Sequence, residues 1–340
     1  MKLEELIHPE DASTLKTLKS IPALPKIMEK VFQYGYDEIS WSENVTTNLR
    51  LSETQMPEIY NHLPPICERL GIPVPELYLQ MSPIANAWTS GHTKTYIVLT
   101  LGLIRRVKGE ELDAVLAHEC GHILCQHVLY QTLANAVFSF GDAIADSLVG
   151  LVGNAAMKPI RHALIAWSRA SELSADRVAC MFTSAETLAR ALVRISMIPK
   201  NIVDIMDIRA WAEQGKDYEA LKDGTAWNKI VHWMANSDVD HPYAPVRAYE
   251  ALLWEKTDTC NRLRTESVRF EAIEKHDVVQ QGSTLLEKGT EVATTGANAI
   301  MEKGAELSAK GSALMDKGLE ITKNVKLGSI IPKLKKNKGI

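Results

Sequence analysis

One helix restricts the fold of this chain more than any other feature of the sequence. It is expected to begin after Gly109, with acidic residues in its first turn, where they suit the positive end of the helix dipole. Apolar residues cover most of its circumference through Leu129, so the helix should be largely buried. It nevertheless carries His118 and His122, whose burial is costly unless each imidazole has a partner. The fold must therefore enclose this helix and provide partners for its histidines.

The two histidines belong to the sequence His118-Glu119-Cys120-Gly121-His122, an HExxH motif. Side chains four residues apart lie on one face of a helix, so both imidazoles can reach one ion. Neutral imidazole is a favoured zinc ligand, and a catalytic zinc has three protein ligands and a water. Glu119 can accept a proton from that water, whose pKa the metal lowers to about 7. The motif predicts one zinc ion per chain, with Glu119 as the general base.

A third ligand must come from elsewhere in the chain. The metzincin extension of the motif requires glycine at 125 and histidine at 128, where this chain has Cys125 and Val128. The thiolates of Cys120 and Cys125 are an alternative, although free cysteines are more often packed in the core. A second expected helix contains Glu172 and Asp176, four residues apart on one face. One carboxylate can bind the metal while the other accepts a hydrogen bond from a ligating histidine.

With these motifs the chain resembles the M48 family of zinc peptidases, the gluzincin group that contains HtpX-like and CAAX prenyl peptidases. The resemblance covers roughly residues 65–254, and an ordered set of segments is more specific than HExxH alone. The segments are Asn86-Ala87, IVLTLGLI at 97–104, ELDAVLAHECGH at 111–122, SELSADRV at 171–178, and His241-Pro242 followed by Arg247.

The resemblance assigns the metal site to particular residues. It implies that His118, His122 and Glu172 are the zinc ligands and that Glu119 is the general base. It also implies that Asp176 orients a ligating histidine from outside the ligand set.

The resemblance further implies two roles toward the substrate. His241 would lie near the developing oxyanion, where a polarised donor stabilises a tetrahedral intermediate. Asn86 would contact the substrate beside the edge strand. Each residue also fits an ordinary turn, because His-Pro pairs and asparagines both favour turns for local reasons.

The remaining sequence predicts an α+β fold that is mostly helical: a zincin-like metallopeptidase domain with a small antiparallel sheet and a C-terminal helical tail. Strands are expected at 77–81 and 95–101, joined through a turn at 86–94, and further helices at 165–182, 186–197, 202–213 and 245–254. Four parts are expected: an N-terminal helical segment packed on the catalytic domain (1–65), the zinc metallopeptidase domain (66–256), a linker or helix (257–281) and a glycine-heptad tail (282–340).

The tail, residues 282–340, carries a seven-residue repeat with glycines on the same face. Each glycine costs a helix about 1 kcal/mol relative to alanine, so the tail should be ordered only when it docks. Its end, 323–340, has lysines and no acidic residue, which fits peripheral contact with an anionic membrane or a partner; a solvated tail is the alternative. The repeat comprises Leu286, Ala293, Ile300, Leu307, Leu314 and Ile321, with Gly289, Gly296, Gly304, Gly311 and Gly318.

Location and partners follow from charge and apolar content. The net charge of −4 and a tail without arginines or aromatic residues argue against nucleic acid as a partner. The acidic N-terminal residues do not fit a secretory signal, and five cysteines without a framework predict reduced thiols in a cytoplasmic location. The most apolar stretch, 132–153, contains Asp142 and Asp146, each of which costs about 2.5–3.5 kcal/mol in a bilayer. It is expected to form buried helices, with a membrane-dipping hairpin as the alternative.

The sequence therefore predicts a zinc-dependent endopeptidase that acts on proteins or peptides. The apolar spans of the integral-membrane M48 members are missing, so the chain resembles the soluble or peripheral members, and prenylated peptides are not expected as substrates. Two other functions remain open: a zinc-containing scaffold without proteolytic activity, and a zinc hydrolase of a non-peptide bond. Nothing in the sequence indicates an oligomeric state.

Overall fold

The computed structural model describes residues 3–33, 35–139, 154–196, 198–221 and 243–265. Three predictions concern residues outside these ranges: the role of His241, the docking tail at 282–340, and the part of the apolar stretch that covers 140–153. The division of the chain into four parts also stays a prediction.

A four-stranded sheet with the order β1-β2-β4-β3 supports the motif helix. The parallel pair is β2 and β4, in which Leu77 lies opposite Ile97, whereas β1 and β3 are antiparallel to their neighbours. The expected all-antiparallel sheet is wrong in this respect, because the segment expected as a turn contains β3. This strand returns the chain along the sheet edge, so that β4 can enter beside β2 in the same direction. The strands are β1 (Leu49–Leu51), β2 (Glu76–Gln80), β3 (Ala87–Ser90) and β4 (Tyr96–Thr100).

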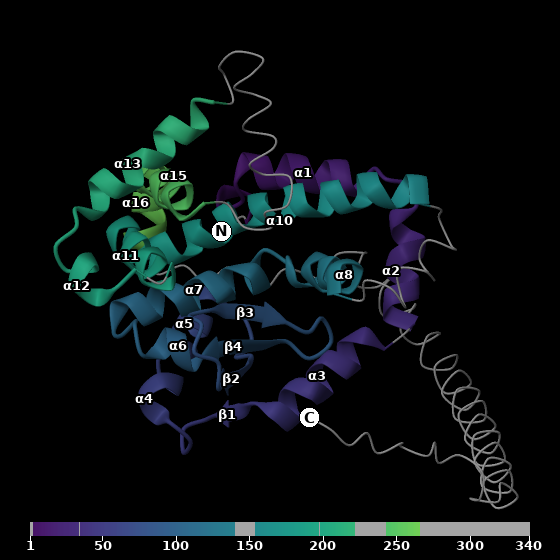
Figure 1. Ribbon diagram of the computed structural model, residues 1–340, viewed down its shortest axis with the longest axis horizontal. Helices are drawn as coiled ribbons and strands as arrows, with labels where there is room; N and C mark the ends of the chain where they lie inside the picture. The colour runs from purple at the N-terminus through teal and green to yellow at the C-terminus, as the bar shows by residue number, and fades with distance from the viewer. Residues whose placement is uncertain (1–2, 34, 140–153, 197, 222–242, 266–340) are drawn as a thin grey trace, which may run out of the picture. The chain divides into compact units, whose positions relative to one another are not determined.

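Three helices are stacked on the sheet in successive layers (Figure 1). Helix α7 (Glu110–Leu124) packs against β3, α10 (Asn154–Phe182) packs on α7, and α1 (Pro9–Lys19) packs on α10. A Cβ atom on Gly121 would lie only 3.0 Å from Cα of Ala175, so glycine permits the close approach of α7 and α10. This approach brings the face of α7 that carries the motif against α10.

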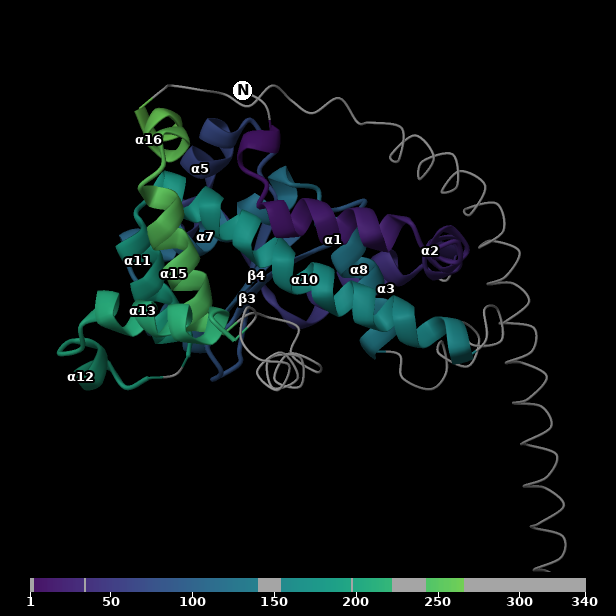
Figure 2. The ribbon, with the colours of Figure 1, turned by 90° about the horizontal axis from the view of Figure 1, so that it is seen from above.

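The other helices enclose these layers, and α11, α13 and α15 gather beside one end of α10 (Figure 2). The mostly helical α+β fold is confirmed. None of the described helices is long and apolar enough to cross a membrane. The remaining helices are the 3-10 helix η1 (Leu3–Glu5), α2 (Leu24–Gln33), α3 (Tyr36–Thr47), α4 (Pro57–Tyr60), α5 (Leu63–Leu70), α6 (Leu101–Ile104), α8 (Val128–Ser139), α11 (Ala185–Ile195), α12 (Lys200–Val203), α13 (Ile208–Glu219), α15 (Ala244–Glu255) and α16 (Asp258–Thr265).

Two expected helices end or break earlier than the sequence pattern indicates. Helix α7 ends at Leu124 rather than continuing to Leu129, because Gln126 adopts a left-handed φ of 60° and N–H of His127 donates to the carbonyl of His122. The helix expected at 202–213 is two helices, α12 and α13. The carboxylate of Asp207 caps the second one by accepting from two backbone N–H groups.

Candidate active site

Two helices bring three potential metal ligands together. Helix α7 provides His118 and His122, and α10 provides Glu172. The two Nε2 atoms are 3.2 Å apart, and the Glu172 oxygens lie 3.4 Å from His118 Nε2 and 3.3 Å from His122 Nε2. All three side chains are buried, and their donor atoms are close enough to hold one metal ion. The cluster matches the ligand set implied by the sequence resemblance.

The cysteines of α7 do not join this cluster. The Sγ atom of Cys120 lies 3.8 Å from Sγ of Cys67 on α5, inside the apolar core. Cys125 is also buried, and burial raises the pKa of its thiol, which opposes a thiolate. The contact of Cys120 and the burial of Cys125 both favour packing over metal ligation.

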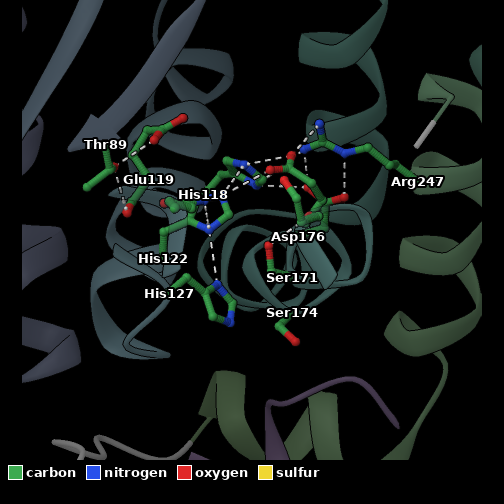
Figure 3. Close-up of polar contacts among 12 residues, drawn as sticks. Thr89, His118, Glu119, His122, His127, Ser171, Ser174, Asp176 and Arg247 are labelled. Atoms are coloured by element: carbon green, nitrogen blue, oxygen red, sulfur yellow. Dashed lines mark hydrogen bonds and ion pairs between the residues drawn. The ribbon is translucent and has the colours of Figure 1, made fainter. Parts of the chain in front are cut away.

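A buried salt-bridge network fixes the side of the cluster that faces α15. Asp176 Oδ1 lies 2.9 Å from His118 Nδ1, as expected of a carboxylate that orients a ligating histidine. The guanidinium of Arg247 donates to both oxygens of Asp176, at 2.7 and 2.8 Å, and its Nη1 lies 2.9 Å from Glu172 Oε2 (Figure 3). Arg247 therefore holds two carboxylates at once, one in the ligand cluster and one behind it.

The surroundings shift the pKa values of the two histidines in opposite directions. Burial and the charge of Arg247 both lower the pKa of His118, but hydrogen bonds from Asp176 and Glu172 and the charge of Glu172 outweigh them and raise it to about 10. Burial lowers the pKa of His122 to about 4, and Glu172 opposes this only in part. A metal ion that binds this cluster would therefore have to displace a proton from His118, whereas His122 already has a free lone pair.

Glu119 lies beside the cluster and points toward the sheet. Its carboxylate accepts a hydrogen bond from Thr89 Oγ1 on β3 at 2.7 Å (Figure 3). Burial raises the pKa of Glu119, while the charge of His118 and the Thr89 hydrogen bond lower it in part. A carboxylate with a raised pKa next to a metal site is suited to accept and release protons.

A cavity of about 430 Å³ opens onto these residues. The two histidines, Glu119 and Glu172 line it, and Asn86 lies at its rim immediately before β3. Asn86 is exposed, and its side-chain oxygen accepts from N–H of Ala87, the local hydrogen bond that also suits a turn. The structure therefore places Asn86 at the cavity.

Comparison with known proteins identifies the family. The model of peptidase family M48 matches residues 53–255. The chain belongs to the M48 peptidase family. This M48 chain is therefore a metallopeptidase, and its matched segment includes the ligand cluster, Glu119, Asp176 and Arg247.

Two relatives illustrate the range of the family. The chain is 27% identical to the plastoglobule-localized metallopeptidase 48 of Arabidopsis thaliana, over 80% of this chain and 78% of the relative. It is 30% identical to a protease HtpX homolog of Pelotomaculum thermopropionicum, over 51% of this chain and 70% of the relative. Among solved structures, S. mikatae Ste24p aligns with a TM-score of 0.37 and 17% identity, over 71% of this chain and 65% of Ste24p.

Three polar residues of this site have contacts that the sequence pattern does not indicate. Thr89 lies in a segment expected as a turn, and Arg247 appeared only as part of the family resemblance. His127, whose Nδ1 lies 3.0 Å from Nδ1 of His122, falls within the helix that the apolar pattern predicts to continue through Leu129. The change of strand and helix boundaries described above brings two of the three to the site.

Proposed function

We propose that this M48 peptidase is a zinc-dependent endopeptidase in which His118, His122 and Glu172 bind one zinc ion. The spacing of the donor atoms is the observation that carries the proposal. Zinc–nitrogen and zinc–oxygen bonds of about 2.0–2.2 Å at tetrahedral angles place neighbouring donor atoms about 3.3–3.6 Å apart. The three separations here are 3.2, 3.3 and 3.4 Å.

The composition of the site favours catalysis over a structural role. Structural zinc sites usually have four protein ligands, whereas catalytic sites have three and keep a position open. Here two imidazoles and one carboxylate face a cavity of about 430 Å³, and a candidate base lies beside them. A scaffold protein has no need of a buried carboxylate with a raised pKa at such an opening.

When bound, the zinc ion supplies Lewis-acid polarisation of the scissile carbonyl and lowers the pKa of water. Glu119 accepts a proton from the attacking water as the new carbon–oxygen bond forms. It then delivers that proton to the departing nitrogen as the carbon–nitrogen bond breaks. Asp176 keeps His118 oriented, and Arg247 holds Glu172 and Asp176 in place. His241 retains its proposed role near the oxyanion.

The edge of the sheet supports a peptide as the substrate. Strand β3 pairs with β4 on one side, and no described strand pairs with its other side. An extended peptide can add to such an edge through backbone hydrogen bonds. Thr89 of this strand contacts Glu119, so a peptide on the edge lies beside the proposed base. We infer that Asn86, at the start of β3, contacts the peptide, and we favour a peptide bond over other hydrolysable bonds.

The five buried free cysteines support a reducing, cytoplasm-like compartment. We retain the prediction that residues 282–340 mediate peripheral contact with a membrane or partner.

The test combines metal analysis with peptide cleavage. Wild type should contain about one zinc per chain, and Glu119→Gln should keep the zinc but lose hydrolysis, because an amide cannot accept the proton. Glu110→Gln is the matched control, since it makes the same change on an exposed position of the same helix. Undiminished cleavage by Glu119→Gln excludes Glu119 as the base. Zinc binding without cleavage of any peptide by wild type favours the scaffold or a non-peptide hydrolase.

A further inference from the structure

A chain of buried polar groups extends from His122 away from the cavity. His122 Nδ1 lies 3.0 Å from Nδ1 of His127, and His127 Nε2 lies 2.9 Å from Oδ2 of Asp11 (Figure 3 shows the two histidines). The same oxygen of Asp11 accepts a hydrogen bond from Ser174 Oγ at 2.6 Å. His127 and Asp11 are 2% and 1% exposed, so bulk water does not replace these contacts. Nothing in the proposed mechanism uses this chain of groups.

The carboxylate of Asp11 restricts the direction of the hydrogen bonds in this row of groups. A carboxylate only accepts, so Nε2 of His127 must carry the proton that it donates to Asp11. When Nε2 carries the single ring proton of His127, its Nδ1 has a lone pair that can accept from Nδ1–H of His122. With its proton on Nδ1, His122 presents the lone pair of Nε2 to the ligand cluster. One carboxylate thereby determines the tautomers of two imidazoles in sequence.

The carboxylate comes from outside the family domain. Asp11 lies in α1, whereas the M48 match begins at residue 53. The start of α1 is attached to α10: N–H of His8 donates to Ser174 Oγ at 2.9 Å, and Arg177 donates to the carbonyl of Ile7 at 3.0 Å. The N-terminal segment is thus held in a position from which it reaches the ligand cluster.

We propose that Asp11 and His127 are positioning residues of the metal site, which hold His122 in the tautomer and orientation that bind the ion. The proposal rests on the proposed function, in which His122 is a zinc ligand. In this proposal Asp11 supports His122 through the imidazole of His127, in the way that Asp176 supports His118 directly. Outer partners of this kind typically contribute about 10–100-fold to metal affinity.

Gln131 is the rival for this role. Its Nε2 lies 3.0 Å from His122 Nδ1, and a rotation of the amide would present its oxygen to the same N–H. A second rival is a purely structural role, in which Asp11 and His127 only attach α1 to the rest of the domain. The experiment must separate both from the proposal.

Two substitutions of His127 each keep one of its two contacts and remove the other. His127→Asn keeps an amide oxygen near the position of Nδ1, so it can still accept from His122 but no longer reaches Asp11. His127→Gln extends to the position of Nε2, so it can still contact Asp11 but leaves His122 without this acceptor. The proposal predicts zinc affinity about 10–100-fold weaker for His127→Gln and close to wild type for His127→Asn. A purely structural role predicts a different result. His127→Asn, which loses the contact with Asp11, should then lower the stability of the zinc-free protein more than His127→Gln.

The measurements use the full chain and zinc alone: competition with a chelator for affinity, the visible spectrum of the cobalt-substituted protein for ligand geometry, and thermal unfolding of the zinc-free protein. Asp37→Asn is a control, because Asp37 is also a buried carboxylate but binds the N–H groups of His92 and Thr93 far from the ligands. A shifted cobalt spectrum and weaker zinc binding in His127→Gln, with unfolding no worse than in Asp37→Asn, support the proposal.

Three results overturn it. Equal zinc affinity in both His127 variants and wild type shows that the contact orients nothing. Losses of affinity that follow the loss of zinc-free stability, larger in His127→Asn, show a structural role. A full loss of affinity in Gln131→Leu, with both His127 variants unaffected, assigns the orientation to Gln131. If wild type itself binds no zinc, the proposed function fails and this inference fails with it.

Discussion

Replacing Thr89 by valine removes one hydroxyl from beside Glu119 while it keeps the size and β-branching of the side chain. The hydroxyl donates to a carboxylate oxygen at 2.7 Å, and a hydrogen bond to a charged acceptor contributes about 1.5–3 kcal/mol. One pKa unit corresponds to about 1.4 kcal/mol, so the loss should raise the pKa of Glu119 by about one to two units. Because the hydroxyl also lies 3.2 Å from the carbonyl of Glu119, we expect the lower end, about one unit.

The assay is the pH dependence of kcat/KM with a fluorogenic peptide. Burial already raises the pKa of Glu119, and the base is inactive when protonated, so Thr89→Val should move the acidic limb upward by about one pH unit. On that limb the variant should be about tenfold slower at a given pH, with little change well above it. Thr89→Ser keeps the hydroxyl and should retain the wild-type limb. An unmoved limb in Thr89→Val, or an equal shift in Thr89→Ser, refutes the role assigned to this hydrogen bond.

Three further predictions concern charge, protons and packing. Arg247→Met leaves Glu172 and Asp176 buried without their cation, so the free energy of unfolding of the zinc-free protein should fall by about 3–5 kcal/mol in denaturant. The decrease should be smaller with zinc present. An unchanged stability of the zinc-free protein contradicts this prediction. Since His118 has a pKa of about 10 and His122 of about 4, zinc binding displaces one proton. The affinity for zinc, measured by chelator competition, should therefore rise about tenfold per pH unit from pH 6 to 8. An affinity that does not change with pH contradicts this prediction. Gly121→Val overpacks the contact with Ala175 and should lower the free energy of unfolding by about 1–3 kcal/mol, measured by thermal melts. If the variant melts at the wild-type temperature, α7 and α10 can move apart without cost.

The ligand cluster could be predicted from the sequence because its members obey short-range rules. His118 and His122 share a helix face by their spacing, and so do Glu172 and Asp176. The family resemblance then assigned one carboxylate to the metal and the other to the outer position. The structure brings these residues together as expected, with Asp176 at 2.9 Å from His118.

The supporting residues could not be predicted in the same way because their contacts depend on boundaries and long-range packing. On a continuous helix, His127 would lie about 140° around the axis from His122, and only the left-handed turn at Gln126 brings it back. Thr89 required β3 to be recognised in a four-residue segment next to a glycine turn. Asp11 lies in the first turn of a mostly polar helix, where an acidic residue is ordinary and indicates no function.

The polar residues that support the ligand cluster come from segments far apart in the sequence. Asp11 precedes its partner His127 by 116 residues, and Arg247 follows its neighbour His118 by 129. During synthesis from the N-terminus, the histidines therefore leave the ribosome well before the cation that holds the carboxylates. Until α15 docks, Glu172 and Asp176 lack Arg247 and are two carboxylates without their cation. In a chain made in this order, the salt bridges that hold Glu172 and Asp176 form only after both ligand-bearing helices have been made.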